Sequence, residues 1–113
     1  MDVVLMKRTG IFFKLKTGKK QDYIDVHHNI WPEVKEALDE AGICNYSIWN
    51  LGEMLFAYYE VEDEERMDRV LAGNEAYQRW RDFMEDFVYK EPLAGTKEWP
   101  MEMVFYNKGK TEV

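Results

Sequence analysis

The stretch MLFAYYEV, residues 54–61, decides the fold, because it reads as a β-strand that is apolar on both of its faces. Successive side chains of a strand point to opposite faces of its sheet. The two faces carry Leu55, Ala57, Tyr59 and Val61 on one side, and Met54, Phe56 and Tyr58 on the other. A sheet built around this strand therefore has two apolar faces, and both of them need cover from water.

A β-hairpin is predicted at this point of the chain. The central strand extends over residues 54–62, and a tight turn at residues 52–53 joins it to a preceding strand over residues 43–51. Alternation along the preceding strand gives one of its faces three side chains, those of Cys44, Tyr46 and Ile48.

Two more strands are expected near the ends of the chain. Residues 9–16 (TGIFFKLK) place Ile11, Phe13 and Leu15 on one face with a period of two, which is typical of a strand. The segment MEMVFYN, residues 101–107, predicts the last strand. The sheet is therefore expected to have four strands.

The first helical region is predicted over residues 20–41. Its apolar stripe, with spacings of three and four, consists of Tyr23, His27, Ile30, Val34, Leu38 and Ala41. Pro32 interrupts the region, because proline lacks the N–H group and clashes with the preceding turn. We expect Asn29 to cap a second segment and Gly42 to end it.

Two shorter helices follow the central strand. Residues 63–65 (DEE) place acidic groups at the start of a helix, where the helix dipole favours them, and Gly73 ends that helix. Asn74 is expected to cap the next one. The stripe of this last helix consists of Tyr77, Trp80, Met84 and Phe87.

The order of these elements is typical of an α+β fold of the ferredoxin-like split βαβ kind, with helices on one face of an antiparallel sheet. The other face would be left as a large apolar patch. We therefore expect a second copy to pack sheet to sheet, giving a homodimer of the dimeric α/β-barrel type. The chain is interpreted as one domain, residues 1–113, with an N-terminal extension (1–7) and a C-terminal tail (108–113).

The charge balance restricts the partners. The formal net charge is −7, from 22 acidic and 15 basic residues, which argues against nucleic acid and against an anionic membrane surface. A neutral small molecule remains a suitable partner. The single cysteine, Cys44, cannot form an internal disulfide, and the chain shows neither a signal peptide nor an apolar stretch that spans a membrane. A cytoplasmic location is expected.

Five residues are candidates for chemistry. His27 titrates near neutrality and has Tyr23 one turn before it on the same helix face, so an imidazole and a phenol lie side by side. Tyr46 points toward them if its face lies under the helices. The flat indole ring of Trp80 could stack on the C–H face of a sugar. The guanidinium group of Arg81 could donate several hydrogen bonds to hydroxyl groups. From position alone, a satisfied buried histidine and ordinary core aromatics are the more frequent explanation.

Signals for a metal or a cofactor are absent from the sequence. It contains no glycine-rich phosphate loop and no H-E-x-x-H or G-x-S-x-G motif. His27 and His28 are adjacent, so they point to different sides of a helix and make a poor metal site. We expect neither a metal nor a cofactor.

Several blocks of the sequence resemble the L-rhamnose mutarotase family. The resemblance extends from about Lys7 to Tyr106, and the blocks occur in the family's order and spacing. They are residues 23–33 (YIDVHHNIWPE), 45–48 (NYSI), 55–57 (LFA), 60–62 (EVE), 78–80 (QRW) and 104–106 (VFY). The resemblance implies a ferredoxin-like homodimer that interconverts the α and β anomers of L-rhamnose or a closely related aldose.

The resemblance also implies roles for the candidate residues. His27 matches the family's proton donor, while Tyr23, Tyr46 and Trp80 match residues that bind the sugar. Arg81 occupies the position of a second tryptophan, so the pocket wall is charged there, and we expect Arg81 to bind a sugar hydroxyl. In the mechanism that follows, His27 protonates the ring oxygen, and Tyr23 or a water held by Tyr46 takes the anomeric proton.

Two other functions remain open from the sequence. Dimeric ferredoxin-like domains also include small oxygenases and haem-binding proteins, in which His27 would be an axial ligand or a base. A non-catalytic sugar-binding dimer is the third hypothesis, because Arg81 departs from the family pattern.

Overall fold

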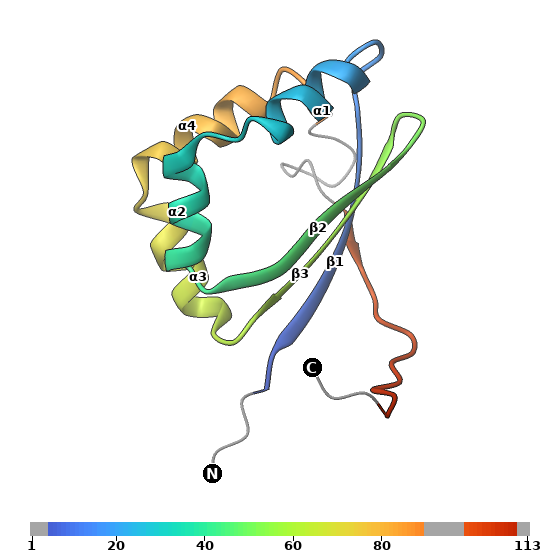
Figure 1. Cartoon of the computed structure of the whole chain (residues 1–113), viewed down its shortest axis with the longest axis vertical. Helices are drawn as coiled ribbons and strands as arrows, with labels where there is room; N and C mark the ends of the chain where they lie inside the picture. Colours follow the sequence, from blue (N-terminus) through green and yellow to red (C-terminus); the bar gives the residue numbers. More distant parts are fainter. Residues whose placement is uncertain (1–4, 90–98, 111–113) are drawn as a thin grey trace.

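The computed structural model describes residues 5–89 and 99–110. Four helices and four strands lie within these ranges (Figure 1). Their order and bounds are β1 (Lys7–Lys14), α1 (Lys20–His28), α2 (Pro32–Glu40), β2 (Ile43–Leu51), β3 (Met54–Val61), α3 (Glu64–Ala72), α4 (Glu75–Met84) and β4 (Trp99–Met101).

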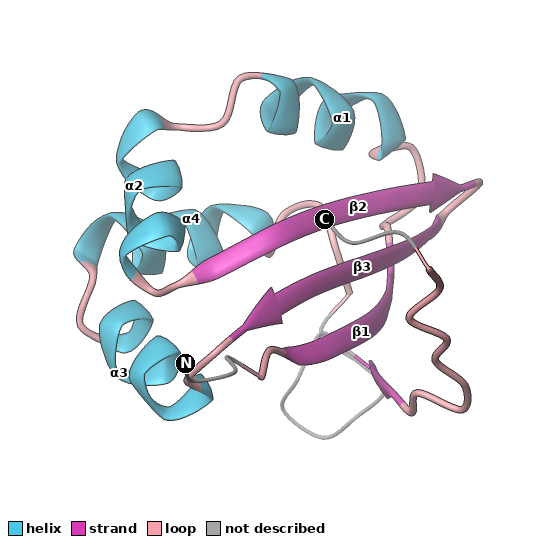
Figure 2. Cartoon of the chain, turned by 60° about the horizontal axis from the view of Figure 1, so that its bottom comes forward, coloured by secondary structure: helices cyan, strands magenta, loops and turns pink. Residues whose placement is uncertain are grey.

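The strands form one antiparallel sheet in the order β2-β3-β1-β4. The helices gather on one face of this sheet, while its other face is not covered by any described helix (Figures 1 and 2). This arrangement confirms the predicted ferredoxin-like fold with helices on one face. The predicted hairpin of β2 and β3 is also confirmed, and β3 ends at Val61.

The first and the last strand in the sequence differ from their predicted bounds. β1 begins at Lys7, within the predicted N-terminal extension, and ends at Lys14; Leu15 follows with an isolated bridge to Val88. The predicted strand over residues 101–107 is wrong beyond Met101, because β4 covers only Trp99–Met101. A strand needs a neighbour for its backbone hydrogen bonds, and only residues 99–101 pair with β1.

The break between α1 and α2 lies at Pro32, as predicted, but the residue that precedes α2 as its N-cap is not the predicted Asn29. Pro32 is the first residue of α2, and Trp31 before it has an extended backbone with ψ of 131°, as the residue before a proline prefers. Asn29 instead follows the end of α1, where its side-chain amide donates to the Asp25 carbonyl oxygen at 2.9 Å. The prediction that Asn29 caps the second segment is therefore wrong.

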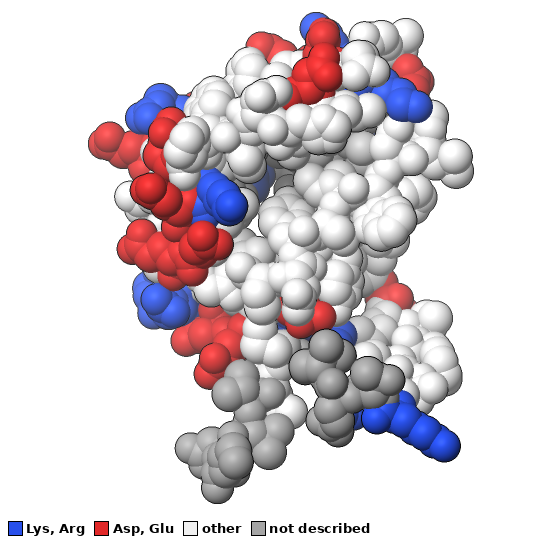
Figure 3. Space-filling view, viewed as in Figure 1, with Lys and Arg blue, Asp and Glu red and all other residues white. Residues whose placement is uncertain are grey.

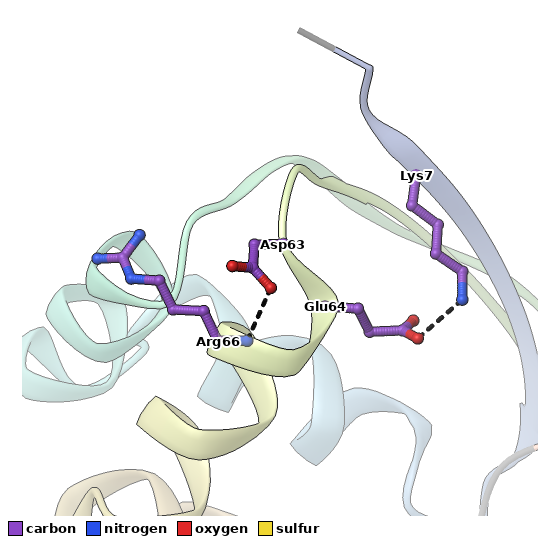
Figure 4. A network of polar contacts seen from close by, with 4 residues as sticks. All are labelled: Lys7, Asp63, Glu64 and Arg66. Carbon is purple, nitrogen blue, oxygen red and sulfur yellow. Dashed lines mark hydrogen bonds and ion pairs between the residues drawn. The ribbon is translucent and has the colours of Figure 1, made fainter.

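The predicted starts of the two short helices are confirmed, and each helix has a side-chain cap. Asp63 accepts a hydrogen bond from the backbone N–H of Arg66 at 3.0 Å, at the start of α3 (Figure 4). Asn74 accepts one from the Tyr77 N–H at 2.9 Å, at the start of α4. Lys7 reaches Glu64 across 2.8 Å and joins the start of β1 to α3 (Figure 4). None of the helices in the described ranges has the length and apolar character that crossing a membrane requires.

β2 contains a β-bulge that changes which side chains face the helices. The pairing with β3 shifts between Cys44 and Ser47, and Asn45 has a left-handed φ of 50°. Ile43 pairs with the buried Val61 and packs against the core, whereas Cys44 is exposed. The prediction that Cys44 shares a face with Tyr46 and Ile48 is therefore wrong, because the extra residue reverses the alternation before Tyr46.

The bulge makes a specific prediction for Asn45. A left-handed φ suits glycine and asparagine but strains β-branched residues. We expect Asn45→Val to destabilise the fold by about 1–3 kcal/mol, whereas Asn45→Gly leaves the backbone unstrained. Urea unfolding of the two variants measures the difference, and equal stability of both would show that the left-handed conformation is not required.

The outer face of the sheet carries a row of aromatic side chains across all four strands. The register places Trp49, Phe56, Phe12 and Trp99 directly opposite one another in turn. The Phe12 ring lies 5.3 Å from that of Phe56 and 4.5 Å from that of Trp99, between centroids. Trp49 is 69% exposed. Figure 3 shows charged side chains gathered over the helices and few over the sheet.

Candidate functional site

The space between the helices and the sheet is only partly filled by core side chains. One core cluster lies around Tyr23, Trp80 and Leu55, and a second one around Val61 and Met67. Between them lies a cavity of about 500 Å³, and Figure 3 shows the hollow between helix layer and sheet. Protein interiors are normally close-packed, so an unfilled volume of this size indicates a ligand site.

All five residues predicted from the sequence line this one cavity. They come from three elements: α1 contributes Tyr23 and His27, β2 contributes Tyr46, and α4 contributes Trp80 and Arg81. The cavity therefore combines an imidazole, two phenols, an indole and a guanidinium group. All of these groups carry hydrogen-bond donors, and the phenols and the neutral imidazole also carry acceptors, so together they can bind several hydroxyl groups of a small polar ligand.

The hydrogen bonding of His27 fixes its tautomer when the ring is neutral. Its Nδ1 lies 2.9 Å from the backbone carbonyl oxygen of Tyr23, one turn earlier in α1. A carbonyl oxygen only accepts hydrogen bonds, so Nδ1 carries the proton. The other nitrogen, Nε2, then presents a lone pair.

The surroundings of His27 favour the neutral ring. Burial lowers the pKa of His27 below its ordinary value of 6.5, because desolvation disfavours the charged form. The hydrogen bond to the Tyr23 carbonyl opposes this effect, and the nearby His28 adds to it. The Tyr23 ring lies 4.1 Å from the imidazole and the Trp80 ring 5.3 Å, between centroids. At neutral pH the side chain is therefore an uncharged base.

Trp80 forms the back of the site. It is 6% exposed, and its ring lies edge-on to those of His27, at 5.3 Å, and Trp31, at 5.0 Å. Trp31 in turn stacks on Phe83 at 5.4 Å. Because rigid aromatic rings surround the imidazole on these sides, its orientation is set by packing as well as by its hydrogen bond.

Tyr46 and Arg81 lie on another wall of the cavity. Tyr46 follows the bulge of β2, and its ring lies 5.8 Å from that of Tyr59. The Arg81 guanidinium lies 6.0 Å above the Tyr77 ring. Arg81 is partly buried and thus not on the solvent side of α4.

Two charged residues of the cavity lining were missed by the sequence analysis. Lys35 and Asp39 of α2 both line the cavity. Each directly follows a residue of the apolar stripe, Val34 or Leu38, so a stripe widened by one position would have included them. Glu33, another charged residue of the same helix, is exposed and lies outside the lining.

The fold and the cavity together define a class of protein. It is a ferredoxin-like domain with a cavity between helices and sheet that one imidazole lines, and the described residues hold no group of three or more His, Cys, Asp or Glu side chains that would bind a metal. The family profile of L-rhamnose mutarotase matches residues 8–107. The chain belongs to the L-rhamnose mutarotase family.

Curated relatives support this assignment. An L-rhamnose mutarotase of Formosa agariphila is 37% identical over 103 residues, which cover 89% of this chain and 98% of that protein. One of Listeria monocytogenes is 36% identical over the same coverage. One of Bacillus subtilis is 43% identical over 77 residues, covering 66% of this chain and 73% of that protein.

Solved structures show the same fold. The crystal structure of the L-rhamnose mutarotase from Formosa agariphila matches with a TM-score of 0.75 and 35% identity, covering 90% of this chain and 99% of that one. An antibiotic biosynthesis monooxygenase from Nitrosomonas europaea matches with a TM-score of 0.61 but only 16% identity, covering 93% and 96%. The second likeness concerns the fold alone.

Proposed function

We propose that this protein interconverts the α and β anomers of L-rhamnose, by acid–base opening and closure of the sugar ring. The observation that carries the proposal is that His27, Tyr23, Tyr46, Trp80 and Arg81 line one cavity in a chain of this family. Ring opening needs a proton on the ring oxygen and the loss of one from the anomeric hydroxyl. No bond to the enzyme and no redox step is required.

His27 is the proton donor in this proposal. In its neutral state Nε2 first takes the proton of the anomeric hydroxyl, because this nitrogen carries the lone pair. The resulting imidazolium then donates that proton to the ring oxygen as the bond between this oxygen and the anomeric carbon breaks. The aldehyde rotates, and the reverse transfers close the ring on its other face. One residue thus moves the proton between two oxygens bound to the same carbon.

The other candidate residues bind the sugar. Tyr23 and Tyr46 offer phenol groups for its hydroxyls, and Arg81 donates to a further hydroxyl from α4. Trp80 closes the back of the cavity and holds the imidazole in place. These roles agree with a ligand that is neutral and rich in hydroxyl groups.

Exchange NMR tests the activity directly. Saturating one anomeric proton of equilibrated L-rhamnose transfers saturation to the other only as fast as the anomers exchange. We expect the exchange rate to rise in proportion to enzyme concentration, and less so for aldoses that differ in the configuration of their hydroxyls. Exchange that stays at the rate of water alone for every aldose would refute the proposal.

We also propose that the protein works as a homodimer, packed through the outer faces of two sheets. The row of Trp49, Phe56, Phe12 and Trp99, with Leu51 beside it at 65% exposure, forms an apolar surface. Monomeric proteins rarely leave such a surface in water. A two-fold axis brings the same surface of each copy together, so the contact closes on itself.

A charge at the centre of this row tests the dimer. Phe56→Glu buries an unpaired carboxylate in the contact, which is strongly unfavourable. We expect the variant to elute as a monomer in size-exclusion chromatography with light scattering, while the wild-type chain elutes as a dimer. Glu62→Lys, at an exposed position after β3, is the control and keeps the dimer. A monomeric wild-type chain would contradict the proposal.

The remaining expectations concern the whole chain and its compartment. We propose one domain over residues 1–113, which agrees with a family match over residues 8–107. A cytoplasmic location agrees with the exposed free thiol of Cys44, since reducing compartments keep such groups unoxidised.

A further inference from the structure

A carboxylate on the outer face of the sheet is bonded to a residue that lines the cavity on the other face. Glu60 of β3 precedes the buried Val61, so its side chain points away from the core. Its Oε1 accepts a hydrogen bond from the side-chain amide of Asn45 in β2 at 3.0 Å, and Asn45 is part of the cavity lining. Its Oε2 accepts one from the Tyr58 hydroxyl at 2.7 Å. Two donors thus fix the position of this carboxylate.

The surroundings of Glu60 keep it ionised at neutral pH. The hydrogen bonds from Tyr58 and Asn45 lower the pKa of Glu60 below its ordinary value of 4.5, because they favour the charged form. Partial burial opposes this shift, and the positive charge of Arg8 adds to it. Arg8 lies directly opposite Glu60 in the register of β1 and β3. The Asn45 amide therefore donates to a charged acceptor, which gives a stronger hydrogen bond than a neutral one.

This hydrogen bond holds β2 where its pairing with β3 is interrupted. The register passes from Cys44 directly to Ser47, so Asn45 and Tyr46 lie in the bulge between them. Asn45 has the left-handed φ of 50° there, a conformation that the chain adopts only with support from its surroundings. β2 is also an edge strand of the described sheet, so the support comes from the β3 side. The bond to Glu60 supplies it at the residue with the unusual backbone.

The conformation of Asn45 decides where the next side chain points. Tyr46 follows it directly and lines the cavity. A bulge re-aims the side chains next to it, because the extra residue bends and twists the strand. Tyr46 is 44% exposed, so core packing restrains it less than it restrains a buried side chain such as Tyr23. The direction of its phenol group therefore depends on the backbone of the bulge.

We propose that Glu60 is a positioning residue for sugar binding: from the outer face of the sheet it holds the bulge at Asn45, and thereby the phenol of Tyr46, in the geometry that binds the sugar. Glu60 lies outside the cavity lining and acts only through these two residues. Its loss weakens binding and leaves the proton transfer at His27 unchanged. This inference rests on the proposed function, in which Tyr46 binds a sugar hydroxyl.

Substitutions of Glu60 separate binding from proton transfer. Exchange NMR over a range of L-rhamnose concentrations is expected to give Glu60→Ala a KM about fivefold above that of the wild type, the effect of one lost hydrogen bond. Its kcat should change less than about twofold, because the lost interaction contributes equally to substrate and transition state. Glu60→Gln keeps a side-chain oxygen for the Asn45 amide and should recover most of the loss. Glu62→Ala removes an exposed carboxylate two residues later and is the control that keeps both constants.

Double variants test the route from Glu60 to the sugar. In a Tyr46→Ala background the phenol is gone, so adding Glu60→Ala should raise KM by less than about twofold more. Asn45→Gly removes the other end of the hydrogen bond, while it tolerates the left-handed φ and leaves the outer face of the sheet unchanged. Adding Glu60→Ala to Asn45→Gly should likewise have little further effect. This second pair separates the positioning role from any effect of Glu60 on the contact between two copies, and thermal unfolding establishes that each variant is folded.

The outcomes distinguish the positioning role from the proposed function. An active wild-type enzyme whose KM stays the same in Glu60→Ala would overturn the positioning role alone. Effects of Glu60→Ala that add in full to those of Tyr46→Ala or Asn45→Gly would do the same, because Glu60 would then act by another route. A Glu60→Gln variant as impaired as Glu60→Ala would show that the charge matters and the held geometry does not. Absence of L-rhamnose exchange in the wild-type enzyme refutes the proposed function itself.

Discussion

Replacing His27 with alanine is expected to lower the rate of L-rhamnose anomer exchange by about 10²- to 10⁴-fold, the usual contribution of one positioned acid–base group. The loss should appear in kcat, with KM changed little, because the imidazole acts on the proton in transfer and contributes less to binding. The measurement is exchange NMR over a range of sugar concentrations.

The adjacent histidine supplies a matched control. His28 is exposed and lies outside the cavity lining, so His28→Ala removes the same side chain one residue further along α1. Its rate should stay within about twofold of the wild-type rate, as expected for a surface change away from the site. Wild-type turnover in His27→Ala would remove His27 from the mechanism.

The pH dependence follows from the lowered pKa of His27. The free enzyme must present a neutral Nε2 to take the anomeric proton, so kcat/KM should fall as the pH drops through the pKa of this group. Burial moves that pKa below 6.5, and the activity should therefore be constant at neutral pH and decline only in more acidic solution. A profile that rises as the pH falls through 6.5 would mean that the resting enzyme needs the imidazolium instead.

Truncation of Trp80 should have the largest effect on stability. Trp80→Ala is expected to lower the free energy of unfolding by about 3–5 kcal/mol, since it removes a buried indole from contact with His27, Trp31 and Phe83. Native domains are stable by only about 5–15 kcal/mol. The variant should thus be close to unfolding at room temperature, as urea titration will measure.

The conservative variant separates packing from catalysis. Trp80→Phe keeps an aromatic ring against His27 and should recover more than half of the lost stability. Its kcat should fall by less than that of His27→Ala, because the imidazole keeps its hydrogen bond to the Tyr23 carbonyl oxygen. A loss below about 1 kcal/mol in Trp80→Ala would show that the aromatic cluster does not support this part of the fold.

The sequence predicts the fold well wherever a pattern is local. The spacing from Tyr23 to Ala41, the proline break at Pro32, the acidic start of α3 and the cap Asn74 all depend on neighbours within four residues. Those features are confirmed. The structure also places the five candidate residues around one cavity. The site was predictable because helix and strand periodicities fix the direction of each side chain.

The errors arise where a distant partner decides the conformation. Residues 101–107 have the alternating pattern of a strand. Within the described residues of one chain, however, only Trp99–Met101 pair with the backbone of β1. The bulge at Asn45 depends on the register with β3, and no local pattern marks it. Lys35 and Asp39 face the cavity because α2 packs against β2 at one particular rotation, which the composition of the stripe does not specify.

The bulge in β2 also affects how the protein avoids uncontrolled assembly. β2 and β4 are the two edges of the sheet, and an exposed edge can template further strands into an open array. The irregular backbone at Asn45 interrupts the ladder on one edge. On the other edge β4 has only three residues, and Pro100 among them lacks an N–H group. Both features of the described edges hinder the growth of filaments by edge pairing, which agrees with the proposed association of two copies through the face of the sheet.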